Sequence, residues 1–177
     1  NPPAKFSIFL NLEQTQDLGF QKYFSSFVND QEKLIEIIAY CLMPTHIHLV
    51  LKQLKKNGIS IYLKNILNSY TRYFNTKHHR IGPLWESRFK SALVKNDNQL
   101  LHLTRYVHLN PVTACLVEKP EEWSFSSYLE YIEKGEVFPI TSYDDLIDIQ
   151  CGIYKKYVKN QVAFQRSLAK IKKLILY

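Results

Sequence analysis

The sequence predicts an α+β fold, in which one antiparallel sheet carries packed helices on one face. Two apolar runs rich in β-branched residues are joined by a short Pro-Thr turn, which is typical of neighbouring antiparallel strands. Two later stretches repeat apolar residues at helical spacing. Three or four strands mixed with two packed helices indicate the α+β class. At 177 residues, 46% of them apolar, the chain 1–177 is expected to form a single domain with its own core.

The first expected elements are a strand at 6–10 and a short amphipathic helix at 20–30. Apolar and β-branched residues dominate 33–43, KLIEIIAYCLM, which predicts a buried strand. Pro44 ends this strand, and 46–52 continues as a second strand with strict alternation of its side chains. The two faces of that strand carry Ile47, Leu49 and Leu51 on one side and His46, His48 and Val50 on the other.

A helix is predicted over 60–76, directly after Asn57-Gly58. Its apolar stripe ends with Tyr70 and Phe74, so these two rings are expected in the core.

A basic loop at 78–88, HHRIGPLWESR, is followed by an expected strand at 89–95. Asp97 is expected to cap the next helix, which runs to Asn110 and is stopped by Pro111.

The last third of the chain is expected to be mostly helical. A short helix at 126–135 is closed by Gly135, and a second helical stretch begins at Asp144. It ends in a basic extension, about 150–177, which could bind DNA, cap the sheet or contact a partner.

Positive charge is concentrated in two segments of the chain. Residues 52–95 carry ten Lys or Arg and one acidic residue, and residues 150–177 carry seven Lys or Arg and no acidic residue. A solvated helix face would explain either segment alone. The two together favour a basic surface for a polyanion, with nucleic acid as the best fit.

Several other classes of protein are disfavoured. No apolar stretch approaches the roughly 20 residues of a membrane span, and the first ten residues lack the layout of a signal peptide. Three widely spaced cysteines, Cys41, Cys115 and Cys151, suit buried thiols in a reducing cytoplasm better than a disulfide framework. Glycine-rich nucleotide loops, a nucleophile elbow and an H-E-x-x-H pair are all missing from the sequence.

The H-x-H pair is the first candidate site. His46 and His48 project from the same strand face, which is the geometry that one metal ion needs for two imidazole ligands. The pattern alone is weak, because histidines are also common on half-exposed strands.

The helix ending at Asn110 offers a third ligand and a reacting group. Tyr106 and Asn110 are four residues apart and therefore lie on one helix face, with His102 one turn earlier. If this face lies over the histidines, the Asn110 side-chain oxygen can be a ligand, the Tyr106 hydroxyl lies beside the metal, and His102 can contact substrate. Otherwise Tyr106 is a tyrosine at the edge of the core, and Asn110 only ends the helix.

Aromatic residues are interleaved with the cations of 52–95. Cations follow phosphates while rings stack on unpaired bases, so this mixture suits single strands or hairpins better than duplex DNA. The candidate contact residues are Arg72, Tyr73, Arg80, Trp85 and Arg88.

Five motifs within about 34–131 resemble the REP-associated tyrosine transposases and their insertion-sequence relatives, which belong to the HUH (His-hydrophobic-His) single-strand nucleases. One departure is Thr45, where the family usually has Asn before the first histidine. In chain order the motifs are CLMPTHIHLVL, YTRYFN, GPLWESRFKSALV, RYVHLNPVTACLV and WSFSSYLEY.

The resemblance implies a ferredoxin-like fold and assigns roles to the candidate residues. It implies that Tyr106 is the nucleophile, forming a 5′-phosphotyrosine link, and that His46, His48 and Asn110 hold a divalent metal, magnesium or manganese. It further implies single-stranded or hairpin DNA as partner, a monomer or homodimer, and a prokaryotic, nucleoid-associated location in the cytoplasm. A non-catalytic nucleic-acid-binding descendant and, more remotely, a zinc hydrolase are the alternatives.

Overall fold

The computed structural model describes residues 33–133 and 139–167. The expected elements at 6–10 and 20–30 and the closing Gly135 lie outside these residues. The chain divides into two units, residues 1–33 and 34–177, and the described elements all belong to the second. In chain order they are β1 (Ile35–Leu42), β2 (Ile47–Gln53), α3 (Gly58–Lys77), α4 (Asp97–Thr113), the 3-10 helix η1 (Pro120–Glu122), α5 (Tyr128–Ile132) and α6 (Cys151–Lys159).

Strands β1 and β2 form an antiparallel pair, as the two apolar runs predicted. The register pairs Leu42 with Ile47 next to the turn and Ile35 with Gln53 at the far end, with a β-bulge between Ile37 and Ala39. A hydrogen bond of 2.9 Å from the Met43 N–H to a backbone carbonyl across the turn closes the hairpin. The mixture of a hairpin and several helices confirms the α+β class.

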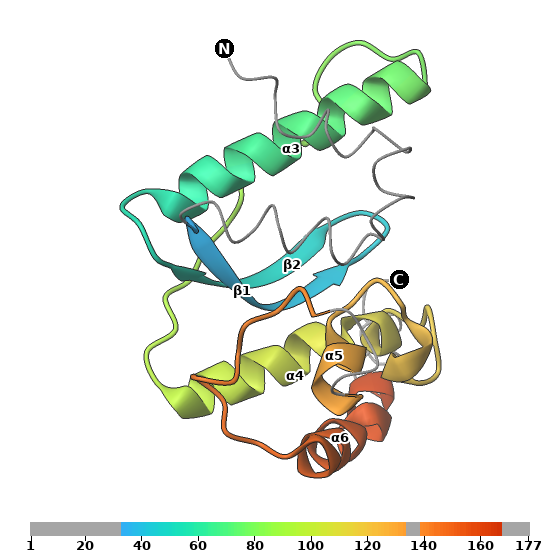
Figure 1. The fold of residues 1–177 in the computed structure, drawn as a ribbon. Coiled ribbons are helices and arrows are strands. Elements are labelled where there is room, and N and C mark those ends of the chain that lie inside the picture. Colours follow the sequence, from blue (N-terminus) through green and yellow to red (C-terminus); the bar gives the residue numbers. More distant parts are fainter. Residues whose placement is uncertain (1–32, 134–138, 168–177) are drawn as a thin grey trace, which may run out of the picture. The chain divides into compact units, whose positions relative to one another are not determined.

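Helices cover both faces of the hairpin, so the prediction of helices on one face is wrong. Helix α4 lies against the face that carries Val50, and α3 lies on the opposite side of the strands (Figure 1). The reason is that both faces of β2 are apolar: Val50 is buried on one, and Leu49 and Leu51 are half-buried on the other. A two-stranded sheet is marginal by itself and must bury such surface against other elements.

Helix α3 confirms the prediction for 60–76, beginning two residues earlier. Asn57 precedes it in the left-handed region, φ 60°, a conformation that asparagine tolerates. The turn before the helix lies tightly on the start of β1, because the N–H groups of Leu54 and Lys55 both donate to the Leu34 carbonyl oxygen. A Cβ on Gly58 would lie 2.3 Å from that same oxygen, so only glycine fits.

Helix α4 departs from the prediction at both ends. Asn96, and not Asp97, is the N-cap, since its side-chain oxygen accepts from the Gln99 N–H at 2.8 Å. The helix also continues through Pro111 to Thr113. In a last turn the proline removes only one helical hydrogen bond, and burial of the residues around it offsets that loss.

The strand expected at 89–95 does not form a ladder with any described residue, so this prediction is wrong. Phe89 and Leu93 are exposed, by 50% and 81%. The outer edge of β1 is already hydrogen-bonded by loop residues, including the bridge from Cys41 to Ser126 and the bond from the Ser142 N–H to Ile37. No place remains on that edge for another strand.

The C-terminal helices are shorter than expected. Helix α5 covers Tyr128–Ile132 within the predicted 126–135. Residues 144–150 form a turn and an irregular segment, so helix α6 begins at Cys151 rather than at Asp144. Tyr143, just before this segment, and Ile147 within it are both buried, and burial of two side chains four residues apart mimics the apolar spacing of a helix.

A buried polar group lies at the centre of the core. The His108 ring of α4 is fully enclosed: Nδ1 is 2.7 Å from the Tyr154 hydroxyl and Nε2 is 2.8 Å from the Ser127 Oγ. The rings of Tyr128, Tyr131 and Tyr154 surround it. Burial lowers the pKa of His108 to about 3, so the imidazole is neutral in the folded protein at neutral pH.

Replacing Gly58 by Ala is expected to lower the free energy of unfolding by about 1–3 kcal/mol, because the new Cβ must displace the Leu34 backbone. Gly152→Ala in α6 is the matched control, since its Cβ meets nothing within 4 Å. The control is expected to be neutral or to stabilise by about 0.4–1 kcal/mol. Chemical denaturation measures both; equal effects would contradict the close approach at Gly58.

Acid is expected to destabilise the fold through His108. The folded-state pKa, about 3, lies below the ordinary histidine value of about 6.5, so the unfolded chain binds more protons as the pH falls between these values. Stability is therefore complete above about pH 6.5 and is lost progressively toward pH 3. The linkage corresponds to about 2 kcal/mol at pH 5. Urea unfolding at pH values from 7.5 to 5 measures this loss of stability. His108→Gln should reduce the loss, and an equal dependence of unfolding free energy on pH in wild type and variant would contradict the assignment.

Candidate functional site

The start of β2 and the middle of α4 bring three aromatic side chains together. The His46 and His48 rings lie 4.7 Å apart between centroids, nearly perpendicular to each other. The His48 ring lies 5.7 Å from the Tyr106 ring, again edge to face. The strand motif and the helix tyrosine are 58 positions or more apart in the sequence, and only the packing of α4 on the hairpin makes them neighbours.

The two histidines are suited to act as neutral ligands. The Nε2 atom of His48 is buried without a hydrogen-bond partner among the described residues, and burial together with the neighbouring His46 lowers the pKa of His48. The Nδ1 atom of His46 lies 3.0 Å from the Thr45 Oγ1. If Nδ1 donates to this oxygen, Nε2 carries the lone pair, which is how a polar neighbour orients a metal-binding imidazole.

Asn110, the third ligand candidate, lies one turn after Tyr106 on α4. Its side chain is 9% exposed, and its Nδ2 donates to the Tyr106 carbonyl oxygen at 3.0 Å. This bond holds the amide so that the side-chain oxygen remains an acceptor. Two neutral imidazoles and one amide oxygen fit a divalent ion of borderline softness.

A zinc-hydrolase donor set is not present in the described residues. Over 33–133 and 139–167, no group of three or more His, Cys, Asp or Glu side chains is placed to hold a metal ion. Among these residues, His46 and His48 therefore have no His, Cys, Asp or Glu neighbour that would complete a zinc site with them.

Tyr106 is the accessible nucleophile candidate. Its side chain is 49% exposed while the residues on either side of the helix face are packed, so its hydroxyl is open to a large substrate. A phenol can attack an electrophilic phosphorus, and its hydroxyl can donate a hydrogen bond to an unpaired imidazole nitrogen. A tyrosine that only borders the core would have the same exposure.

The candidate contact residues on α3 and the following loop divide into two groups. Arg72, Tyr73, Arg80 and Arg88 are exposed. Trp85 is half-buried, and its indole N–H donates to the Leu67 carbonyl oxygen of α3 at 3.3 Å. Trp85 thus fixes the loop on the helix and presents only part of its ring.

Tyr70 does not lie in the core as predicted. It is 47% exposed and lies 6.0 Å from the Trp85 ring and 6.4 Å from the Tyr73 ring. The helix extends beyond the hairpin that its first half covers, so the apolar stripe continues past the surface that buries it. These rings, with Lys77 5.6 Å from the Tyr73 centroid, form a mixed aromatic and basic surface.

Two residues near Tyr106 escaped the sequence analysis. Arg105 stacks on Tyr157 of α6, and both contact His102, one turn before Tyr106. Arg105 could have been noticed from the sequence, because it directly precedes the nucleophile candidate Tyr106. Nothing local marked Tyr157, because its role depends on how α6 packs against α4.

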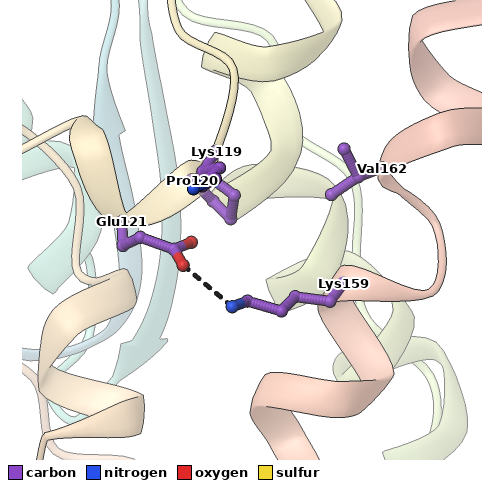
Figure 2. A pocket seen from close by; sticks show the side chains of 5 residues that line it. All are labelled: Lys119, Pro120, Glu121, Lys159 and Val162. Carbon is purple, nitrogen blue, oxygen red and sulfur yellow. Dashed lines mark ion pairs between the residues drawn. The ribbon is translucent and has the colours of Figure 1, made fainter.

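A separate hollow lies between η1 and α6. It has a volume of about 220 Å³ and is lined by five residues, shown in Figure 2. An ion pair of 3.0 Å between the Lys159 Nζ and a Glu121 carboxylate oxygen crosses it (Figure 2). Burial raises the pKa of Glu121, but the hydrogen bond and charge of Lys159 outweigh it and lower that pKa. None of the predicted site residues lines this hollow. The ion pair that crosses it joins η1 to α6.

No helix among the described residues combines the length and the apolar character that crossing a bilayer requires.

Comparison with known proteins gives one family and two relatives. Residues 12–110 match the family model described as transposase, IS200-like. A Haemophilus influenzae protein provisionally named a REP-associated tyrosine transposase is 30% identical over 115 residues, covering 59% of this chain and 64% of the relative. The REP-associated tyrosine transposase of Escherichia coli K12 is 24% identical over 123 residues, covering 69% of this chain and 71% of the relative. No solved structure matches the chain.

Proposed function

The chain belongs to the family of IS200-like transposases, and from this we propose that it is a metal-dependent single-strand endonuclease and strand transferase acting beside hairpin-forming DNA. The family match shows a transposase-type relationship, and the names of both relatives agree with it. The observation that carries the finer proposal is the 5.7 Å contact between the His48 and Tyr106 rings. This contact supports the proposal that the H-x-H pair and the tyrosine act in one site.

In the proposed reaction, Tyr106 is the nucleophile. Its phenolic oxygen forms a bond to the scissile phosphorus, and the bond from phosphorus to the 3′ oxygen breaks. The phenolic proton is lost, and the leaving oxygen takes up a proton as a 3′-hydroxyl. The product is a 5′-phosphotyrosine link, which conserves the phosphodiester bond energy and lets the strand be rejoined without a nucleotide cofactor.

His46, His48 and Asn110 are the residues that would hold a divalent ion. When bound, such an ion polarises a non-bridging phosphate oxygen and stabilises the charge that develops on it. The Thr45 hydroxyl, 3.0 Å from the His46 Nδ1, orients that imidazole. The hydrogen bond from the Asn110 Nδ2 to the Tyr106 carbonyl oxygen holds the third ligand against the backbone of the nucleophile.

Single-stranded or hairpin DNA is the proposed substrate. The exposed cations Arg72, Arg80 and Arg88 suit backbone phosphates, and Tyr73 is exposed for stacking on an unpaired base. We assign Trp85 a contact through its exposed ring edge only, because it also anchors the loop. Duplex DNA, whose bases are already stacked, would use only the cations.

For the whole chain we propose one domain with a ferredoxin-like fold, working as a monomer or homodimer in the prokaryotic cytoplasm at the nucleoid. The antiparallel β1–β2 pair would supply two of the strands of such a sheet.

Tyr106→Phe is expected to abolish covalent attachment while leaving binding within about twofold, because only the attacking oxygen is removed. Labelled hairpin-bearing single-stranded DNA is incubated with the protein and manganese and run on a denaturing gel. Wild type should give a DNA-shifted protein band, and Tyr106→Phe should not.

Tyr70→Phe is the matched control, because it removes a hydroxyl from another exposed tyrosine that has no assigned DNA contact, and it should keep the shifted band. Tight binding without a band in wild type, across varied hairpins, would instead indicate a non-catalytic nucleic-acid-binding descendant.

Manganese is expected to support cleavage at least as well as magnesium. Magnesium prefers oxygen ligands, whereas two imidazoles and an amide suit manganese better. Rates of strand cleavage are compared after chelation and readdition of each metal. Activity with magnesium but none with manganese would contradict the ligand set His46, His48 and Asn110.

A further inference from the structure

Three side chains form a cluster one helical turn before Tyr106. The Nη2 of Arg105 lies 2.9 Å and the Tyr157 hydroxyl 3.0 Å from the same atom, the Nδ1 of His102. The Arg105 guanidinium also lies over the Tyr157 ring, with 4.1 Å between its central carbon and the ring centroid. The cluster therefore connects the exposed face of α4 to α6.

The hydrogen bonds decide which atoms of this cluster point outward as donors. A guanidinium can only donate, so the His102 Nδ1 must be the acceptor, and a neutral ring then carries its proton on Nε2. Arg105 uses part of its fork on His102 and forms no ion pair with a carboxylate among residues 33–133 and 139–167. The cluster thus has spare N–H donors and a full positive charge, which is the chemistry that receives an anion.

Stacking on Tyr157 gives Arg105 a defined position before any ligand arrives. An arginine on a solvent-exposed helix normally loses conformational entropy when it binds. Here the cation–π contact and the bond to His102 hold the guanidinium plane in advance, so less entropy remains to be lost.

The distance from Tyr106 limits what the anion can be. His102 lies four residues before Tyr106, which places it about 6 Å along the helix axis on the same face. Successive phosphates of one strand are about 3.4 Å apart along a stacked helix and further apart when the strand is extended. A phosphate held near Arg105 is therefore next to one held at Tyr106.

We propose that Arg105, positioned by Tyr157 and His102, binds the phosphate adjacent to the scissile phosphate and so fixes the register of the DNA strand on Tyr106. This inference rests on the proposed function. It assigns the backbone contact nearest to the reacting atoms to the joint between α4 and α6, not to the basic surface of α3.

The first test measures binding alone, in the Tyr106→Phe background, with single-stranded oligothymidine as the probe. Loss of one phosphate contact lowers the slope of log affinity against log salt by about 0.7 for a single strand. Arg105→Gln should show this decrease and bind about tenfold more weakly at low salt. An unchanged slope with a lower melting temperature would mean that Arg105 only joins the helices, and would overturn the inference.

The role of Tyr157 separates positioning from direct contact. Tyr157→Phe keeps the ring beneath Arg105 and should bind within about twofold of the parent. Tyr157→Leu removes the ring and should weaken binding several-fold while Arg105 still carries its charge. Equal affinities of the Leu and Phe variants would show that stacking does not organise the site.

The second test locates the phosphate. Single neutral methylphosphonates replace each phosphate in turn in a hairpin-bearing single strand, and each oligonucleotide is bound by the parent and by Arg105→Gln. Each methylphosphonate and the Arg105→Gln change should weaken binding when made alone. At one position beside the cleavage point their effects on the binding free energy should not add, because both changes remove the same contact. Lys156→Gln, which removes an exposed charge next to Tyr157, is the control. Its loss of binding free energy should add to that of the methylphosphonate at the same position.

The two tests distinguish failure of the inference from failure of the proposed function. Covalent attachment through Tyr106 together with additive losses at every phosphate would overturn only the Arg105 contact. If Arg105→Gln lowers the salt slope by the expected amount but wild type forms no covalent product, the phosphate contact stands and the assignment of Tyr106 as nucleophile is overturned.

Discussion

The position of α4 on the hairpin depends on one buried, neutral histidine. The His108 ring bonds to the Tyr154 hydroxyl of α6 on one side and to the Ser127 Oγ on the other. Ser127 in turn exchanges hydrogen bonds with the backbone of Tyr40 in β1, accepting from its N–H at 2.9 Å. One side chain thus connects three elements, and losing any partner would leave a buried polar atom unpaired at a cost of about 1–3 kcal/mol.

The proton positions in this network follow from the need to satisfy every group. If the Tyr154 hydroxyl donates to Nδ1, the ring keeps its proton on Nε2, donates it to Ser127, and needs no charge. Tyrosine rings exclude water around it, with Tyr131 stacked on Tyr143 at 3.7 Å and its hydroxyl donating to the Ile38 carbonyl. The lowered pKa of His108 is a consequence of that enclosure.

The candidate site is the other face of the same helix. Residues buried by the network, such as His108 and Thr104, alternate along α4 with Tyr106, whose ring lies beside that of His48, and with Asn110, one turn after Tyr106. A helix fixed along one side has its opposite side fixed as well, within the tolerance of packed side chains. The exposed Tyr106 therefore has a defined position, although its own side chain makes few bonds. The same holds for the Arg105 stack, which uses the α4–α6 joint formed by this network.

The sequence alone determined the local features, because these depend on neighbours in the chain. Period-two alternation fixed the hairpin and the shared face of His46 and His48, and helical spacing fixed the shared face of Tyr106 and Asn110. Local signals failed where a distant element decided the outcome. The segment 89–95 has strand-like residues, but the edge of β1 is bonded by residues near 126 and 142. Tyr70 continues an apolar stripe, but α3 extends past the surface that buries its first half. Only the tertiary structure placed His48 beside Tyr106, and Tyr157 beneath Arg105, because each pair joins separate elements that pack around a buried interior that includes His108.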